Sequence, residues 1–237
     1  MRTVAEPARN LTKANESQAA EQTQKSAFRE YVEAFGVALI LAIIIRTFLI
    51  QAYKIPSGSM EPTLLIGDHI LVNKLIYGLR LPDSIFGLKI PGVPWGQYVF
   101  RLEPVHRGDV VVFVFPPDPT KDFIKRVIGV PGDSVQVKNG IVWLNGKEMD
   151  DPHAHREVPE GERSPMSPRD NFGPVTVPPD KLLMMGDNRD RSYDSRFWGF
   201  VDTDEVEGRA ILIYWSWNAD ATSIIPIRWS RFGRIIY

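Results

Sequence analysis

The stretch DVVVFVFPPDPTKDFIKRVIGVPGDSVQVKNGIVWLNGKEM, from Asp109 to Met149, decides the fold class. Its first apolar run, Asp109–Phe115, lies between a glycine and a Pro-Pro pair, which is typical of a short strand buried on both faces. A second apolar run, Asp122–Val130, ends at Pro-Gly-Asp. Asn-Gly pairs follow at 139–140 and 145–146, and Asn-Gly is a strong signal for a tight β-hairpin. The stretch therefore predicts successive antiparallel strands.

Apolar runs bounded by turn residues predict three more strands outside this stretch: His69–Tyr77, Lys181–Asp187 and Ala210–Trp217. The segment Asp150–Pro179, which precedes the predicted strand Lys181–Asp187, is polar and rich in proline. This composition indicates an excursion from the core. The expected fold is therefore mainly β. Residues 54–138 and 180–237 would form an antiparallel β-sheet domain, and residues 139–179 would form a smaller inserted β-hairpin and loop excursion.

The composition is that of an ordinary globular protein and excludes several kinds of chemistry. Hydrophobic residues make up 43% of the 237 residues, which is enough for one large or two modest domains. The formal net charge of -1 gives no electrostatic reason to expect a nucleic-acid partner. Cysteine is absent, which excludes disulfides, thiolate nucleophiles and cysteine-based metal sites.

A long apolar run, AFGVALILAIIIRTFLIQAY from Ala34 to Tyr53, precedes the β region. About 20 helical residues cross a bilayer core, and the run is apolar on all faces, so we expect a transmembrane anchor at 34–53 after a polar tail at 1–33. Arg46 lies toward one end of the run, where its side chain can reach the headgroups. Two alternatives are a buried core helix and a cleavable secretory signal, although residues 51–54 offer no small-x-small cleavage site.

The basic residues predict the orientation of this anchor. More of them precede the run than follow it closely: Arg2, Arg9, Lys13, Lys25 and Arg29 before, and Lys54 and Lys74 after. Because cytoplasmic flanks carry the excess of Lys and Arg, we expect a cytoplasmic tail and a main domain on the far side of the membrane.

The segment Ile55–Leu64, IPSGSMEPTL, is the first candidate for chemistry. Two prolines and a glycine constrain it, and two serines, Ser57 and Ser59, flank the glycine. A serine nucleophile needs a fixed position, a base and donors for the oxyanion. The alternative is a plain linker between the helix and the domain, and the spacing alone does not decide between them.

Lys125 and Arg126 lie within a predicted apolar strand and form the second candidate. Burial can lower the pKa of a lysine toward the ~7–8 that suits a general base. Arginine keeps its proton, so Lys125 is the candidate base and Arg126 is expected to make a structural or surface salt bridge. The alternative is a pair of surface cations at a sheet edge.

The segment Gly186–Arg196, GDNRDRSYDSR, is the third candidate. It reads equally as a surface loop of ion pairs. Asp190, Ser192 and Asp194 alternate as calcium ligands would, but the turn glycine and closing glutamate of an EF-hand loop are missing. No metal site or cofactor is expected. None of the four histidines, His69, His106, His153 and His155, lies in a Ser-His-Asp frame. A serine protease here would therefore need a base other than histidine.

Four segments, in this order behind the apolar run, resemble the conserved boxes of the type I signal peptidases, also called leader peptidases. Pro56–Leu64 is similar to the box of the nucleophile, and Arg107–Phe113 to the next box. Lys125–Asp133 resembles the box that carries a lysine, and Gly186–Arg196 resembles the last box. One such box is a weak signal, whereas four in order are highly specific.

The resemblance implies a Ser–Lys catalytic dyad. Ser59 would be the nucleophile and Lys125 the general base. The Ser57 hydroxyl and the Ser59 backbone N–H would bind the oxyanion.

The resemblance also implies supporting roles in the last box. Ser192 would hydrogen-bond and orient the lysine, and Gly186 would pack close to it. Asp194 and Arg196 would form a structural pair.

The family has an antiparallel β fold, shared with self-cleaving repressors of the LexA type, and cleaves signal peptides from secreted preproteins. The resemblance therefore implies preprotein substrates with small residues before the scissile bond, bound as an added strand. It also implies a bacterial plasma-membrane enzyme, with lipid contacts expected at Gly78–Val105, Trp215 and Trp217. Two alternatives are a non-catalytic β domain on the same scaffold and a self-cleaving repressor, which should carry a DNA-binding domain.

Overall fold

The computed structural model describes residues 28–82, 91–93, 95–218 and 226–237. The chain divides into two compact units, Met1–Arg46 and Thr47–Tyr237, which we call the helical unit and the β unit. The expected tail at 1–33 lies mostly outside the described residues, as does the 83–90 part of the segment expected to contact lipid.

One long apolar helix covers Phe28–Leu49 and ends in a π-helical turn, η1 (Ile45–Leu49). It is long and apolar enough to cross a membrane, and none of its most apolar window is buried, which does not support the core-helix alternative. The helix differs from the expected span 34–53 at both ends. Its last expected turn is instead strand β1 (Ile50–Lys54), because these backbone groups pair with β2 (Asp68–Asn73).

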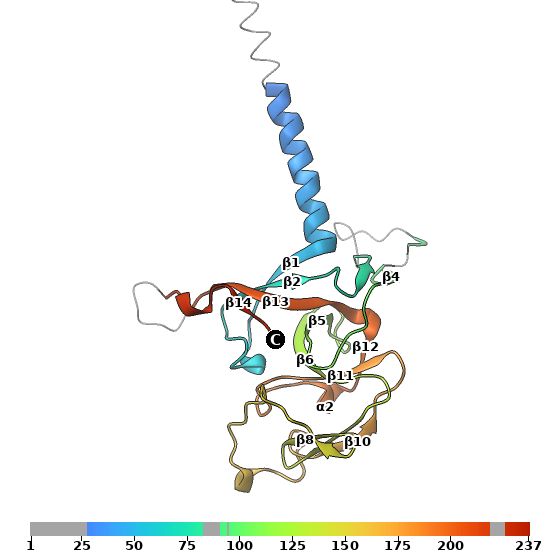
Figure 1. Ribbon diagram of the computed structural model, residues 1–237, viewed down its shortest axis with the longest axis vertical. Coiled ribbons are helices and arrows are strands. Elements are labelled where there is room, and N and C mark those ends of the chain that lie inside the picture. Colours follow the sequence, from blue (N-terminus) through green and yellow to red (C-terminus); the bar gives the residue numbers. More distant parts are fainter. Residues whose placement is uncertain (1–27, 83–90, 94, 219–225) are drawn as a thin grey trace, which may run out of the picture. The chain divides into compact units, whose positions relative to one another are not determined.

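The β unit contains a main antiparallel sheet of eight strands, which confirms the mainly β fold (Figure 1). The strand order is β1-β2-β13-β5-β6-β11-β12, with β14 beside β13. The remaining bounds are β5 (Val110–Val114), β6 (Asp122–Gly129), β11 (Lys181–Met185), β12 (Val201–Asp202), β13 (Val206–Ser216) and β14 (Arg234–Ile235). Every residue of β5 is buried, as its unbroken apolar run predicts.

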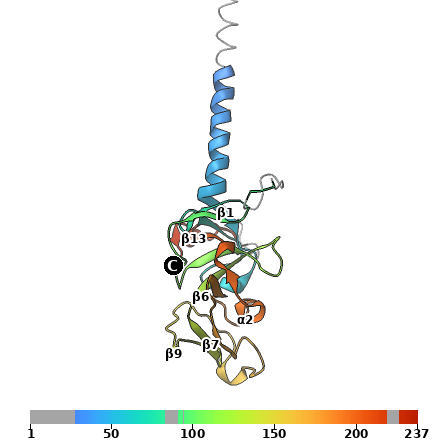
Figure 2. The same cartoon turned by 90° about the vertical axis from the view of Figure 1, so that its right-hand side faces the viewer.

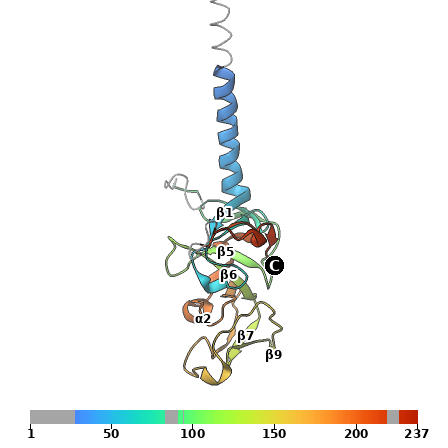
Figure 3. The same ribbon diagram turned by 90° about the vertical axis from the view of Figure 1, so that its left-hand side faces the viewer.

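A second sheet, in the order β10-β7-β8-β9, forms the inserted region. Its strands are β7 (Ser134–Lys138), β8 (Ile141–Leu144), β9 (Lys147–Glu148) and β10 (Phe172–Thr176). Both predicted hairpins are confirmed, since Asn139, Gly140, Asn145 and Gly146 all have the positive φ of tight hairpin turns. The insert begins at β7, before the expected boundary at 139, because β7 pairs with β8 and β10. In the two turned views, β7 and β9 lie at the end of the β unit away from β1 (Figures 2 and 3).

Short elements complete the β unit. They are the ribbon of β3 (Gly78–Arg80) and β4 (Tyr98–Arg101), the helix α2 (Ser195–Trp198), and the 3-10 turns η2 (Gly58–Met60), η3 (Glu160–Glu162), η4 (Thr203–Glu205) and η5 (Trp229–Arg231).

The core positions the serine segment. Ile55, Met60 and Leu64 are fully buried and pack in one cluster with apolar side chains of β2, β5 and β13. Each such side chain contributes about 1.5–3 kcal/mol by leaving water. Apolar residues on both sides of Ser59 therefore fix this segment on the main sheet.

Candidate active site

Ser59 is the middle residue of the short turn η2, which begins directly after Ser57, a residue with an extended backbone. Its neighbour Met60 is fully buried, and the Leu64 N–H donates to the Met60 carbonyl at 2.9 Å. Ser59 itself is 8% exposed. A plain linker would not bury its side chains in this way, so the structure does not support the linker alternative.

Lys125 lies on β6 and is 4% exposed, which excludes a surface cation at this position. Its Nζ atom lies 2.8 Å from Ser59 Oγ and 2.8 Å from the Ile124 carbonyl oxygen. Burial lowers the pKa of Lys125 from its ordinary 10.5 to about 8, although the Asp194 and Asp187 carboxylates oppose the shift. With this pKa, roughly a tenth of the amine is neutral at pH 7, and a neutral amine can accept a proton.

Arg126, the next residue, makes a buried ion pair with Asp187. Its Nε and Nη2 atoms donate to the two carboxylate oxygens at 2.8 and 2.7 Å. Thr63 Oγ1 donates to the same carboxylate at 2.5 Å. The sequence left a structural or a surface bridge open, and the bridge is structural because both side chains are buried. Asp187 thereby connects the residue after Lys125 to the segment of Ser59.

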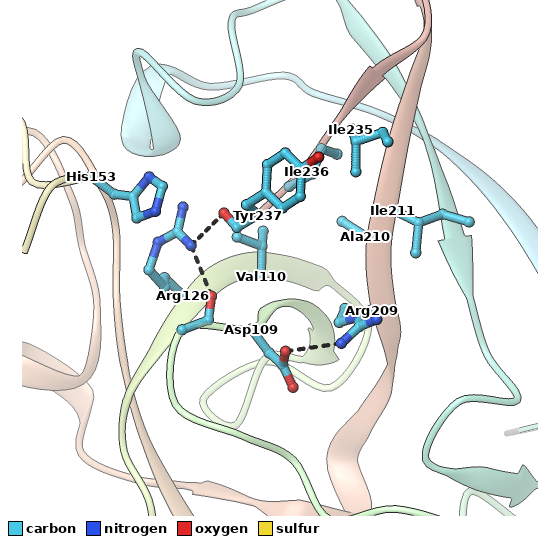
Figure 4. A pocket seen from close by; sticks show the side chains of 11 residues that line it. Asp109, Val110, Arg126, His153, Arg209, Ala210, Ile211, Ile235, Ile236 and Tyr237 are labelled. Carbon is cyan, nitrogen blue, oxygen red and sulfur yellow. Dashed lines mark hydrogen bonds and ion pairs between the residues drawn. The ribbon is translucent and has the colours of Figure 1, made fainter.

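The far side of Arg126 faces a separate pocket of about 420 Å³ (Figure 4). There Nη1 donates to the Gly108 carbonyl at 2.8 Å and to the Tyr237 oxygen at 2.7 Å. An ion pair between Asp109 and Arg209 lies on another wall of the pocket. Arg126 has its hydrogen-bonding groups engaged on both sides, so its role is to hold β6 in place.

Gly186 packs closely against Ser59 and Ser192. A Cβ atom at this position would lie 2.3 Å from the Ser59 carbonyl oxygen and 2.4 Å from Ser192 Oγ, which no side chain tolerates. The Asn188 N–H donates to the same Ser59 carbonyl at 3.1 Å. The loop after β11 therefore meets the nucleophile segment backbone to backbone, and only glycine permits this approach.

Ser192 is fully buried but makes no hydrogen bond within the described residues, so the expected bond to Lys125 is not formed in this structure. It lies close enough to Asp194 to help keep that carboxyl ionised, in a geometry too poor for a hydrogen bond. Gly186 brings the Ser192 hydroxyl next to the Ser59 backbone. The Ser192 side chain would have to rotate for its hydroxyl to point toward Lys125.

Asp194 and Arg196 form the expected pair, with two hydrogen bonds of 2.8 Å between fully buried side chains. Burial favours a raised pKa for Asp194, but the Arg196 guanidinium outweighs it and holds the pKa below its ordinary value. Asp194 also accepts from the backbone N–H of Gly186 at 3.1 Å. The pair therefore fixes the loop that contacts Ser59.

The calcium alternative fails because its carboxylates have other partners. Asp194 is paired with Arg196, and Asp190 accepts from Arg163 and from two backbone N–H groups. In the described part of the chain, no three carboxylate or imidazole groups lie together as a metal would require.

An open pocket of about 400 Å³ gives access to the site. Ser57, Ser59 and Lys125 line it together, with Phe123 and Tyr193 among its apolar and aromatic walls. The residue pattern of Gly186–Arg196 does not by itself mark Asp187 as a site residue. Arg126 gives the signal that could have found it, since an arginine in an apolar strand needs a buried carboxylate.

Known proteins that are similar in sequence to this chain indicate its family. The family described as signal peptidase, peptidase S26, matches residues 28–215. A probable signal peptidase I-2 from Synechocystis sp. is 38% identical over 201 residues, covering 82% of this chain and 77% of that protein. Signal peptidase I from Pseudomonas fluorescens is 34% identical over 236 residues, covering 87% and 78%.

A solved structure of a signal peptidase I from Enterococcus faecalis V583 is 27% identical, with a TM-score of 0.37 over 46% of this chain and 97% of that chain.

The chain therefore belongs to the signal peptidase family, peptidase S26, which is a family of serine proteases. Its curated relatives are signal peptidase I enzymes, and signal peptidase I function, a hydrolase activity, is the function of this chain.

Proposed function

We propose that this chain is a membrane-anchored endopeptidase that removes signal peptides from secreted preproteins, with Ser59 as nucleophile and Lys125 as general base. The carrying observation is the 2.8 Å separation of Lys125 Nζ and Ser59 Oγ. It joins the two segments that the sequence singles out. The adjacent Arg126 is committed to Asp187 and cannot lose its proton.

The proposed reaction begins with Lys125 in its neutral form. The amine takes the Ser59 hydroxyl proton as Oγ attacks the scissile carbonyl carbon, and a tetrahedral oxyanion forms. The resulting ammonium then protonates the departing amine of the mature protein, which leaves an acyl-enzyme. The Lys125 amine, neutral again, then deprotonates a water molecule. This water attacks the acyl-enzyme, the proton returns to Ser59 Oγ, and the signal peptide is released. General base catalysis of this kind typically contributes about 10²–10⁴-fold.

The proposed oxyanion donors are the Ser57 hydroxyl and the Ser59 backbone N–H. Ser59 lies in the first turn of η2, where backbone N–H groups have no partner within the helix. Ser57 is exposed, and it lines the same pocket. Removing one donor of this kind typically costs about 10²–10³-fold in rate.

The other residues of the last box have proposed supporting roles. Ser192 would turn toward Lys125 and orient its amine once substrate binds. Gly186 would permit close approach of the loop to the nucleophile segment, and the Asp194–Arg196 pair would hold that loop. These roles agree with the burial of all four residues.

The proposed substrates are secreted preproteins with small side chains before the scissile bond, bound in extended form. We propose that the helix Phe28–Leu49 anchors the enzyme once in a bacterial plasma membrane, with a cytoplasmic N-terminus and the β unit outside the cytoplasm. Ser59 follows this helix closely in the sequence, so we propose that cleavage takes place at the membrane surface. Trp217, which is 43% exposed, and Trp215 are proposed lipid contacts.

The test is cleavage of a purified preprotein by the detergent-solubilised chain, with the new N-terminus sequenced. We expect Ser59→Ala to remove cleavage, and Ser164→Ala, at an exposed serine of the insert, to leave it unchanged. Full cleavage by Ser59→Ala would overturn the assignment of the nucleophile. Absence of cleavage by the unaltered chain would overturn the proposed activity.

A further inference from the structure

One segment of the insert, residues 151–158, lies against the loop that contacts Ser59. We call it the docking segment. Its His155 N–H donates to the Asp187 carbonyl at 2.7 Å, and the Arg189 N–H donates to the His155 carbonyl at 2.9 Å. These bonds bracket Asn188 in a parallel β-bridge. The docking segment therefore adds one strand-like neighbour to the loop.

Side chains reinforce this contact from the loop side. The Asp190 carboxylate accepts from the backbone N–H groups of Glu157 and Val158 at 2.6 and 2.8 Å. It also accepts from Arg163, further along the insert, at 3.1 Å. A carboxylate that binds two adjacent N–H groups fixes the direction of the backbone that carries them.

A second carboxylate, from the insert, reaches a buried arginine of the loop. Asp151 Oδ2 and Arg189 Nη1 form an ion pair at 2.5 Å without the geometry of a hydrogen bond, and the two side chains are 4% and 1% exposed. Arg189 Nε donates to the Gly186 carbonyl at 2.9 Å. The Arg189 guanidinium therefore lies between the insert and Gly186, with Asp151 compensating its charge.

Gly186 is the residue through which this arrangement reaches the nucleophile. Its carbonyl accepts from Arg189, its N–H donates to Asp194, and its Cα lies against the Ser59 carbonyl. Both polar groups of this residue are thus held. A shift of Gly186 would move either Ser59 or Ser192, because no space separates them.

We infer that Asp151 is a positioning residue for the reaction, acting through Arg189 and Gly186 on Ser59, and that the insert thereby helps to build the active site. The inference rests on the proposed function for its kinetic readout. Asp151 lies outside the four sequence boxes. A displacement of about 1 Å at a nucleophile can lower the rate by about 10²-fold. Loss of Asp151 should therefore lower kcat rather than change KM.

The test compares Asp151→Asn with Asp133→Asn. Asp133, in the turn before β7, is also a buried carboxylate that binds an arginine, Arg107, at 2.9 and 2.7 Å. Its other side-chain bonds go to Val130 and Asn145, away from the loop. We expect Asp151→Asn to lower kcat at least about tenfold with little change in KM, and Asp133→Asn to lower thermal stability without that loss of kcat. Equal loss of kcat in both variants, or none in Asp151→Asn, would overturn the inference.

A double variant keeps the inference testable if Asp151→Asn folds poorly. Asp151→Leu with Arg189→Met removes both charges, and buried pairs replaced in this way often keep their stability. Because the Gly186 carbonyl still loses its donor, we expect the kcat of the double variant to stay at least about tenfold below that of the unaltered chain. Recovery of full kcat would show that Arg189 only needs neutralising, and would contradict the inference.

Amide hydrogen exchange separates this inference from the proposed function. We expect the backbone N–H groups of Gly186, Asn188 and Arg189 to exchange faster in Asp151→Asn than in Asp133→Asn. This readout needs no substrate. A chain that fails to cleave preproteins but shows faster exchange would refute the proposed function and leave the positioning role standing, whereas unchanged exchange would refute the positioning role.

Discussion

Lys125 and Arg126 are adjacent cations in one strand, and the fold gives them different surroundings. Arg126 meets a carboxylate that compensates its charge, whereas Lys125 meets a hydroxyl and a backbone carbonyl. Burial without a directly bonded anion favours the neutral amine, which is the cause of the lowered pKa. The chemistry at this site therefore depends on which of two neighbouring cations has a carboxylate partner.

Lys125→Arg tests this difference at the residue scale. The variant keeps a positive charge but cannot supply a neutral base, so we expect kcat/KM to fall by about 10²–10⁴-fold. Lys181→Arg, in a more exposed pair with Asp202, should have no effect on activity. Steady-state cleavage of a signal-peptide substrate measures both, and activity retained by Lys125→Arg would argue against a lysine base.

The sequence could identify the lysine but not its surroundings. Arg126 is excluded as a base because arginine keeps its proton. Lys125 and Ser59 are identified because four segments occur in the order of the signal peptidase boxes. The partner of Arg126 and the present rotamer of Ser192 depend on contacts between segments far apart in the chain. Such contacts follow from tertiary packing, which residue spacing does not encode.

At the scale of elements, the site is held together by packing around the turn η2. Met60 and Leu64 anchor this turn in the core, and Asp187 bonds it to β6 through Thr63 and Arg126. The turn is only three residues long and has no intrinsic stability. Its geometry therefore depends on apolar burial and on one buried carboxylate.

Leu64→Ala measures that dependence. The variant leaves a cavity beneath η2, and we expect it to lower the free energy of unfolding by about 2–5 kcal/mol. Leu102→Ala, at a leucine that is 60% exposed, should change it by less than about 0.5 kcal/mol. Denaturant unfolding compares the two variants, and equal effects would mean that the turn is not anchored by the core.

Strand elements were predictable because their patterns are local. The buried run of β5 and the two Asn-Gly hairpins are confirmed where the sequence placed them. The boundary between helix and first strand was less accurate, because Ile50–Lys54 is apolar enough to continue the helix. Pairing with β2, a distant contact, decides that segment as a strand.

At the scale of the whole molecule, an apolar helix and a β unit share one chain. The helix exposes its apolar side chains, including Phe35, Leu39 and Ile43, all along its length. Water would penalise this surface, and lipid would not. The composition of the helix therefore supports a membrane anchor, in agreement with the proposed location.

Extraction from membranes tests the anchor. We expect the chain to remain in the membrane pellet in high salt and alkaline carbonate, and to become soluble in detergent, because apolar burial rather than charge would hold it. A peripheral membrane protein of known behaviour serves as the control. Release by salt alone would contradict the anchor and revive the repressor-like alternative.

The pH dependence of kcat/KM tests the Ser59–Lys125 dyad most directly, because it reports the ionisation of the free enzyme. The neutral base is lost as pH falls below the pKa of Lys125, which is about 8. We expect kcat/KM to rise about tenfold per pH unit up to that value and then to level off. A flat profile between pH 6 and 9, or an inflection near the ordinary histidine value of about 6.5, would contradict a lysine base.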